Sequence, residues 1–106
     1  MDKPSEAPVA FQRAFAIRNK LAADDPNNAL YADHLASSYV DIGDVKVANQ
    51  NWDDATEAYK DANNILQKWC DKEPENSERM KRLNKVQQKL AAVSALRTKA
   101  ENALQP

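Results

Sequence analysis

The strongest constraint on the fold of this chain is that one stretch of its sequence occurs twice, at an offset of 48 residues. The matching positions are Ala14, Ile17, Leu21, Pro26 and Asn28, which recur as Ala62, Ile65, Trp69, Pro74 and Asn76. The match extends on both sides, with Phe11 on Tyr59 before it and Leu35 on Leu83 after it. An internal repeat of this length predicts an array of one supersecondary unit, in which each copy buries its apolar face against the next. Proteins built this way bind other molecules more often than they catalyse reactions.

Length and composition indicate a single helical domain over residues 1–106. The chain has one glycine and is rich in Ala, Leu, Lys, Glu and Gln, which favour helices. No stretch approaches the roughly 18 apolar residues of a membrane span, and the amino terminus lacks the apolar region of a signal peptide. The single cysteine cannot form an internal disulfide. We therefore expect a cytoplasmic protein with no membrane partner, in which residues 1–6 form a flexible tail.

Prolines and asparagines divide the chain into four segments whose apolar residues have helical spacing. Pro8 suits the first turn of a helix, and the breaks at Pro26 and Pro74 each include an asparagine or acidic residue that can cap the next helix. The expected helices cover residues 8–23, 28–50, 53–72 and 76–103. Because the loops are short, consecutive helices must be antiparallel. The predicted fold is all-α, and its expected buried residues are Phe11, Ile17, Leu35, Tyr39, Ile42, Tyr59, Ala62, Leu83 and Leu90.

The one glycine, Gly43, lies inside the second expected helix, where it is about 1 kcal/mol less favourable than alanine. A glycine there suggests that a neighbouring helix approaches closely. The alternative is a neutral glycine that the helix tolerates. We favour close approach, because small residues leave room for large aromatic side chains, here Tyr39, Trp52 and Tyr59.

The segment over residues 28–72 resembles a tetratricopeptide repeat. In that family, two antiparallel helices pair through large residues, a Leu/Ile-Gly pair and small alanines. The corresponding positions here are Tyr39, Ile42 and Gly43, then Trp52 at the turn, then Ala55, Tyr59 and Ala62. Outside this segment the likeness weakens, since Phe11 and Ala14 match a second helix without its partner and the last helix has Ala91 in place of the glycine.

The resemblance implies a short right-handed solenoid, ordered as half-repeat, full repeat and half-repeat. The period of 48 residues, longer than the family's usual length of about 34, is similar to long-period bacterial variants. Such variants often occur as tandem arrays attached to signalling or enzymatic domains. Two alternatives stay open: a piece of a longer array, or a self-contained small domain whose outer helices are polar caps.

Catalytic chemistry finds little support in the sequence. The only histidine, His34, and the only cysteine, Cys70, lie on different expected helices with no third group to orient either. One glycine cannot form a phosphate-binding loop, and residues 24–28 lack the glycine and the terminal glutamate of a calcium loop. We expect no enzymatic activity, no cofactor and no metal.

Charge is distributed unevenly although the formal net charge is −1. Residues 1–76 hold 8 Lys and Arg against 14 Asp and Glu, whereas residues 77–106 hold 7 against 2. Arg82, Lys85 and Lys89 share one stripe of the last helix, which is either a solvated face or a surface for an acidic partner or the next repeat. Nucleic acid is a poor fit, because aromatic residues are not interleaved with the basic ones and the rest of the chain is acidic.

In tetratricopeptide pairs the first helix of each repeat lines a concave surface. Carried onto this chain, that surface consists of Ser37, Val40, Asp41, Asp44, Val47, Lys85, Gln88 and Lys89. Asp41 and Asp44 would repel a terminal carboxylate, so carboxy-terminal peptides are not the expected ligand. The expected function is a protein–protein interaction module or adaptor that presents this groove to an extended or helical segment of a partner protein. The alternative is a structural fragment whose terminal helices form homo-oligomers, or a piece of a longer array attached to a signalling domain.

Overall fold

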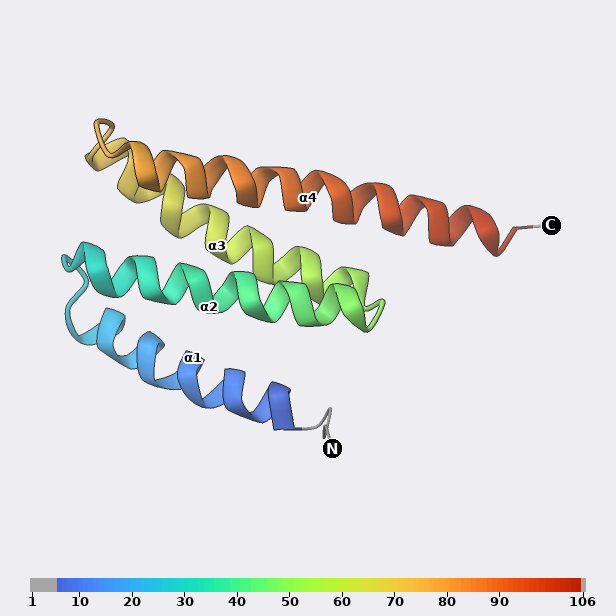
Figure 1. The fold of residues 1–106 in the computed structure, drawn as a ribbon, viewed down its shortest axis with the longest axis horizontal. Helices are drawn as coiled ribbons and strands as arrows, with labels where there is room; N and C mark the ends of the chain where they lie inside the picture. Colours follow the sequence, from blue (N-terminus) through green and yellow to red (C-terminus); the bar gives the residue numbers. More distant parts are fainter. Residues whose placement is uncertain (1–5, 106) are drawn as a thin grey trace.

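A computed structural model of the chain describes residues 6–105, and within that range it contains four α-helices and no strand. The helices are α1 (Glu6–Asp24), α2 (Ala29–Ala48), α3 (Trp52–Lys72) and α4 (Ser77–Ala103) (Figure 1). The all-α prediction is confirmed, and each helix begins and ends within two residues of its predicted boundary. The predicted tail ends earlier than expected, because Glu6 already belongs to α1; residues 1–5, and their predicted flexibility, lie outside the described residues.

The two proline-containing turns have the same hydrogen bonds at the 48-residue offset. In each turn the asparagine N–H donates to the carbonyl three residues earlier, at 3.1 Å for Asn28 and 3.1 Å for Asn76. The Oδ1 of Asn28 accepts from the N–H of Tyr31 at 3.2 Å, and that of Asn76 accepts from the N–H of Arg79 at 3.0 Å. Both asparagines therefore cap the following helix, as predicted. The local structure repeats where the sequence repeats.

The third turn joins α2 to α3 through a Schellman motif. The N–H of Asn51 donates to the carbonyl of Lys46 at 2.8 Å, and the N–H of Gln50 donates to the carbonyl of Val47 at 2.9 Å. This motif requires a left-handed residue after the helix, usually glycine, and Gln50 takes that conformation with φ 59°. The turn thus ends α2 without the glycine that usually marks such an end.

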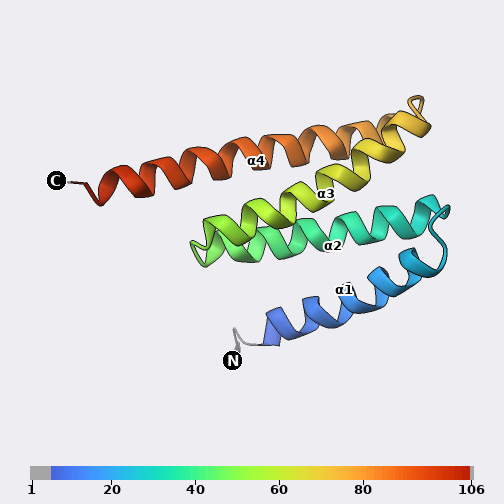
Figure 2. The same cartoon turned by 180° about the vertical axis from the view of Figure 1, so that it is seen from behind.

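The helices pack in the order of the chain, α1 on α2, α2 on α3 and α3 on α4. Figures 1 and 2 show α1 and α4 at opposite edges, so the helices do not close into a four-helix bundle. The carboxy-terminal part of α4 projects beyond the other helices (Figure 1), and Val93 is the last residue of α4 that is buried. No helix in residues 6–105 is long and apolar enough to cross a membrane.

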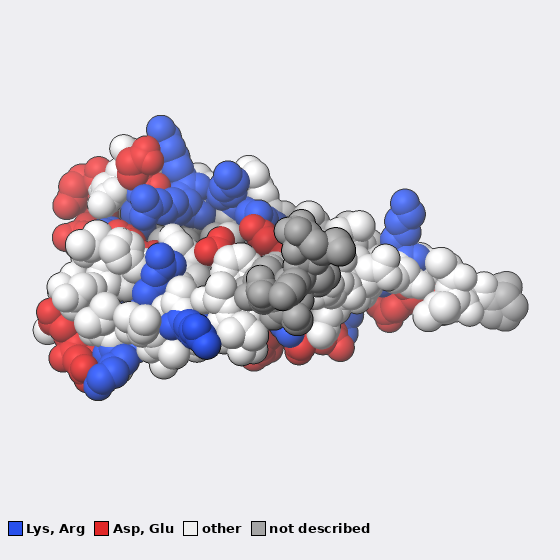
Figure 3. Space-filling view, turned by 60° about the horizontal axis from the view of Figure 1, so that its bottom comes forward, with Lys and Arg blue, Asp and Glu red and all other residues white. Residues whose placement is uncertain are grey.

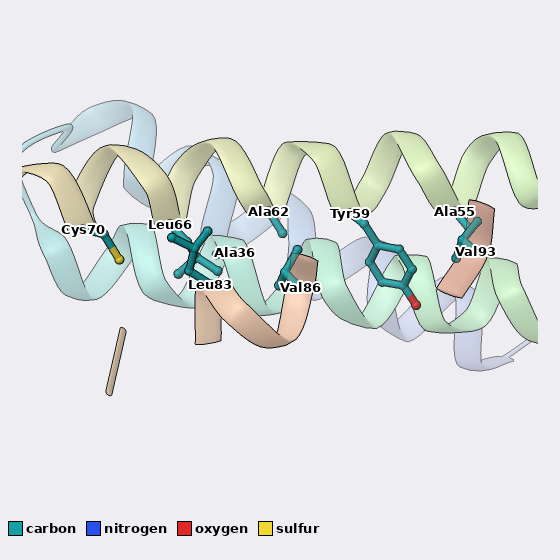
Figure 4. Close-up of a cluster of buried hydrophobic side chains, with 9 residues drawn as sticks. All are labelled: Ala36, Ala55, Tyr59, Ala62, Leu66, Cys70, Leu83, Val86 and Val93. Atoms are coloured by element: carbon teal, nitrogen blue, oxygen red, sulfur yellow. The ribbon is translucent and has the colours of Figure 1, made fainter. Parts of the chain in front are cut away.

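The core follows the inner face of α3, which lies between α2 and α4. Figure 4 shows side chains of α3, such as Tyr59, Ala62 and Leu66, directed toward those two helices. Ala62 is completely inaccessible to solvent, as is Ala55 two helical turns earlier in α3. Small residues at these positions allow the axis of α3 to approach its neighbours closely.

Four of the nine residues predicted to be buried are buried. Leu35, Tyr59, Ala62 and Leu83 are buried, and four others are half-buried: Phe11, Tyr39, Ile42 and Leu90. The close approach predicted at Gly43 is confirmed, because this glycine is buried against the ring of Tyr59.

The prediction that Ile17 is buried is wrong, because its side chain is 62% exposed. The first helix packs mainly on α2, through the edge-to-face pair of Phe15 and Tyr39 with ring centroids 5.0 Å apart. In the same interface, Nη1 of Arg18 donates to Oγ of the buried Ser38 at 2.8 Å. A helix with one neighbour buries one stripe, and Ile17 lies outside that stripe.

Candidate functional site

A cavity of about 240 Å³ lies between α2 and α4, above α3. Helices α2 and α4 run in the same direction, because each is antiparallel to α3 (Figure 1). The apolar part of the cavity lining comes from all three helices and consists of Ala36, Val40, Leu66 and Val86. The floor is therefore rigid, because Ala36, Leu66 and Val86 also belong to the buried core.

The two walls of this groove carry opposite charges. The α2 wall is formed by Asp33, Ser37, Asp41 and Asp44, and the α4 wall by Arg82, Lys85 and Lys89. Figure 3 shows basic side chains gathered over the first half of α4, with acidic side chains directly beside some of them. A ligand in the groove would therefore meet negative charge on one side and positive charge on the other.

One end of the groove is closed by a buried arginine. The guanidinium of Arg79 binds Asp33 through two parallel hydrogen bonds, Nε to Oδ1 and Nη2 to Oδ2, both 2.9 Å long. Its Nη1 donates to Glu73 at 2.8 Å, and its guanidinium lies 5.8 Å from the centre of the Trp69 ring. The hydrogen bonds to Asp33 raise the pKa of Arg79, which burial alone would lower. This pair links α2 to α4, although neither helix follows the other in the chain.

The other end of the groove is closed by Asp44, Tyr59 and Lys89. The hydroxyl of Tyr59 donates to Oδ1 of Asp44, and Nζ of Lys89 donates to the same oxygen at 2.9 Å. Burial raises the pKa of Tyr59, and its hydrogen bond to the Asp44 carboxylate raises it further. The ammonium group also lies 5.9 Å from the centre of the Tyr59 ring. These contacts hold α2, α3 and α4 together at one point.

The middle of the groove has charged groups that take no part in the ion pairs at its two ends. Asp41 on α2 and Lys85 on α4 are both exposed, and neither forms an ion pair with another residue in the described part of the chain. Their charges are therefore available to a ligand that enters between the walls, whereas Asp33 and Asp44 are already neutralised.

Six of the eight residues predicted for the groove line this cavity: Ser37, Val40, Asp41, Asp44, Lys85 and Lys89. The other two do not. Val47 is half-buried and packs against the hydrophobic core, and Gln88 is exposed outside the cavity. Val47 follows the groove residues of α2 in helical register but lies beyond the ion pair of Asp44 that closes the groove.

Sequence reasoning missed Asp33 as a wall residue and Leu66 and Val86 as the floor. Asp33 could have been found, because it precedes Ser37 and Asp41 at the same spacing of four residues on α2. Arg82 was recognised as part of the basic stripe of α4 but not as a groove residue. Leu66 could not be found from the sequences of α2 and α4, since it comes from the intervening helix α3.

The residues weighed for catalysis have ordinary environments. His34 is exposed, and Cys70 is buried in the core. Burial raises the pKa of the Cys70 thiol, an effect that the nearby Arg79 charge opposes without reversing. A raised pKa leaves less of the reactive thiolate at neutral pH. Among the side chains that the structure describes, over residues 9–105, no three His, Cys, Asp or Glu residues are grouped as metal ligands.

No protein-family model, curated protein or solved structure matches this chain.

Proposed function

We propose that this chain is a protein–protein interaction module and that the groove between α2 and α4 binds a segment of a partner protein. The proposal is for binding rather than catalysis. Its main support is one observation: apolar residues form the floor of the groove, and oppositely charged walls flank that floor. A rigid apolar floor supplies affinity, and charged walls supply specificity and orientation.

The resemblance to tetratricopeptide repeats supports the same function. On this reading the groove is the concave side of a short right-handed solenoid, α2 and α3 form a full repeat, and α1 and α4 are half-repeats. The repeated turns at Asn28 and Asn76 favour this reading, because they position α2 and α4 in the same way.

The charges define what the partner segment should contain. An apolar side chain would occupy the cavity, an acidic residue would face Lys85 and Arg82, and a basic residue would face Asp41. Because α2 and α4 are parallel, the groove has a direction as well as two sides, so a bound segment would have one preferred orientation.

Selection of a displayed random-peptide library on the immobilised protein tests this proposal. We expect the selected peptides to share an apolar residue between an acidic and a basic one. The variants Asp41→Lys and Lys85→Glu should each weaken binding of a selected peptide by about tenfold, as removal of a charged contact does. The double variant should regain affinity for a peptide whose two charges are exchanged.

Glu57→Lys is the matched control. Glu57 is exposed and lies nine residues before Leu66, on the opposite side of α3 from the floor of the groove. Glu57→Lys replaces a negative charge by a positive one, as Asp41→Lys does, and it should leave peptide binding unchanged. Equal weakening by both substitutions, or selected peptides that bind both groove variants normally, would show that the groove is not the binding site.

A further inference from the structure

The internal repeat relates the two edges of the molecule to its centre. At the 48-residue offset, α1 corresponds to α3 and α2 corresponds to α4. The contact of α1 with α2 is therefore the counterpart of the contact of α3 with α4. The remaining contact is that of α2 with α3. Because α2 corresponds to α4 and α3 corresponds to α1, its counterpart would be a contact of α4 with α1. Within the described chain, α4 and α1 do not pack on each other as α2 and α3 do.

One face of α1 is exposed where the matching face of α3 is covered. Ile17 is largely exposed, whereas its counterpart Ile65 packs against the core. Leu21 is 39% exposed, but its counterpart Trp69 is only 7% exposed. Because α3 is covered by α2 as well as α4, the uncovered positions of α1 are those that a helix like α2 would cover.

One face of α4 is exposed where the matching face of α2 is covered. Asn84 and Ala91 are exposed, while their counterparts Ala36 and Gly43 are buried. Six exposed residues of this face carry no charge: Asn84, Gln87, Gln88, Ala91, Ser94 and Ala95. The basic residues Lys81 and Lys99 lie at the two ends of this face in helical register, and its middle carries no charge. Burying the uncharged middle costs less than burying charges, provided that its amides and hydroxyl find hydrogen-bond partners.

The chemistry of the two edges also matches. In the α2–α3 interface the Tyr59 hydroxyl binds the Asp44 carboxylate. At the edges the counterparts are Phe11, which has no hydroxyl, and Ala92, which has no carboxylate. Both members of the polar pair are replaced together, so neither edge would bury an unpaired polar group where the centre has this hydrogen bond.

We propose that a second copy of this chain covers these faces, with α1 of one copy docking on α4 of the next in the manner of the α2–α3 pair. The interface uses different surfaces on the two copies, so it is heterologous and leaves one free face at each end. Chains of this protein therefore add head to tail as concentration rises. This interface does not include the α2–α4 groove and is independent of the proposed binding function.

Sedimentation of the full chain over a concentration series, about 10 μM to about 1 mM, tests the proposal. We expect the average mass to rise from 11.9 kDa toward that of two or more chains. Ile17→Asp and Ala91→Lys should each weaken association by about tenfold or more, because each places a charge in the buried centre of the interface. An average mass that stays at one chain throughout would overturn the proposal.

Ala16 provides a matched control for Ile17. Ala16 is exposed, and its counterpart Asn64 is exposed in the centre of the molecule as well. Ala16→Asp should therefore leave association unchanged. Helical content measured by circular dichroism verifies that all three variants fold. If the control weakens association as much as Ile17→Asp does, the register is wrong and the proposal fails.

Mixing the two test variants distinguishes this arrangement from a symmetric dimer. The Ile17→Asp chain retains its α4 face and the Ala91→Lys chain retains its α1 face, so an equimolar mixture should form a one-to-one dimer that does not grow. A mixture that remains monomeric, or that forms longer assemblies, contradicts head-to-tail docking.

Discussion

The ring of Tyr59 fills the space that a side chain at position 43 would occupy. A Cβ atom added to Gly43 would lie under 3.0 Å from three carbon atoms of the ring. The ring cannot easily move, because its hydroxyl is bound to Asp44 and its face is covered by the core. The single glycine of the chain therefore sets how closely α2 and α3 approach, and through Asp44 it also determines where one end of the groove closes.

Gly43→Ala should destabilise the protein by about 1–2 kcal/mol. Alanine favours the helix by about 1 kcal/mol, but overpacking a filled core typically costs about 1–3 kcal/mol or more, and here three ring atoms are in conflict. Urea denaturation followed by circular dichroism measures the difference. In a Tyr59→Ala background the same substitution should become stabilising, because the conflicting ring is gone; an unchanged sign would contradict the packing argument.

Asp33→Asn should destabilise the protein by about 3 kcal/mol, because it removes the more buried of the two carboxylates that pair with the Arg79 guanidinium. The side chains of this pair are only 4% and 14% exposed. Glu73→Gln provides the comparison, since Glu73 is 45% exposed and should contribute about 1 kcal/mol or less. Replacing the pair together, with Arg79→Met and Asp33→Leu, should cost less than Asp33→Asn alone. Equal losses for Asp33→Asn and Glu73→Gln would show that burial does not control this network.

The Tyr59 hydroxyl should make stability sensitive to alkaline pH. Its pKa is raised in the folded protein, so the folded state keeps its proton above the ordinary value of 10.0 while the unfolded chain releases it. The contribution is present below that pH and is lost as pH rises further. The free energy of unfolding should therefore fall more steeply above pH 10.0 for the native chain than for Tyr59→Phe. Parallel pH profiles for the two proteins would refute this assignment.

Gln50→Gly should stabilise the protein by about 0.5–1 kcal/mol. Position 50 has φ 59°, a left-handed conformation that glycine adopts without the steric penalty of a side chain. Gln50→Val should instead be destabilising, because β-branched residues tolerate this conformation poorly. Thermal unfolding of both variants gives the two signs, and stabilisation by valine would be inconsistent with the Schellman turn.

Much of the secondary structure could be predicted because its signals are local. The helix ends follow from Asn28 and Asn76, whose side chains bond to backbone N–H groups three residues away. The end of α2 was placed near Gln50 although no glycine marks it. The close contact at Gly43 was also predictable. Glycine destabilises the interior of a helix, so a glycine there usually indicates that a neighbouring group packs too closely for a side chain.

The groove could be predicted in part. Helical register placed Asp41, Lys85 and Lys89 on the inner faces of their helices, and the structure brings these residues to one cavity. Register could not show that Asp44 and Lys89 pair while Asp41 and Lys85 stay available. That distinction depends on the distance between side chains of α2 and α4, and Asp44 and Lys89 are 45 residues apart in the chain.

The sequence by itself determined the four helices, their caps and the repeat, because these depend on residues within a few positions of one another. Only the tertiary structure decided that Arg79 is buried, that Asp33 is its partner and that Ile17 is exposed. Burial of a charge is favourable only when an opposite charge meets it with the right geometry, and that geometry depends on how α2 and α4 are placed across α3. Exposure of an apolar residue depends in the same way on which faces of α1 have a neighbour.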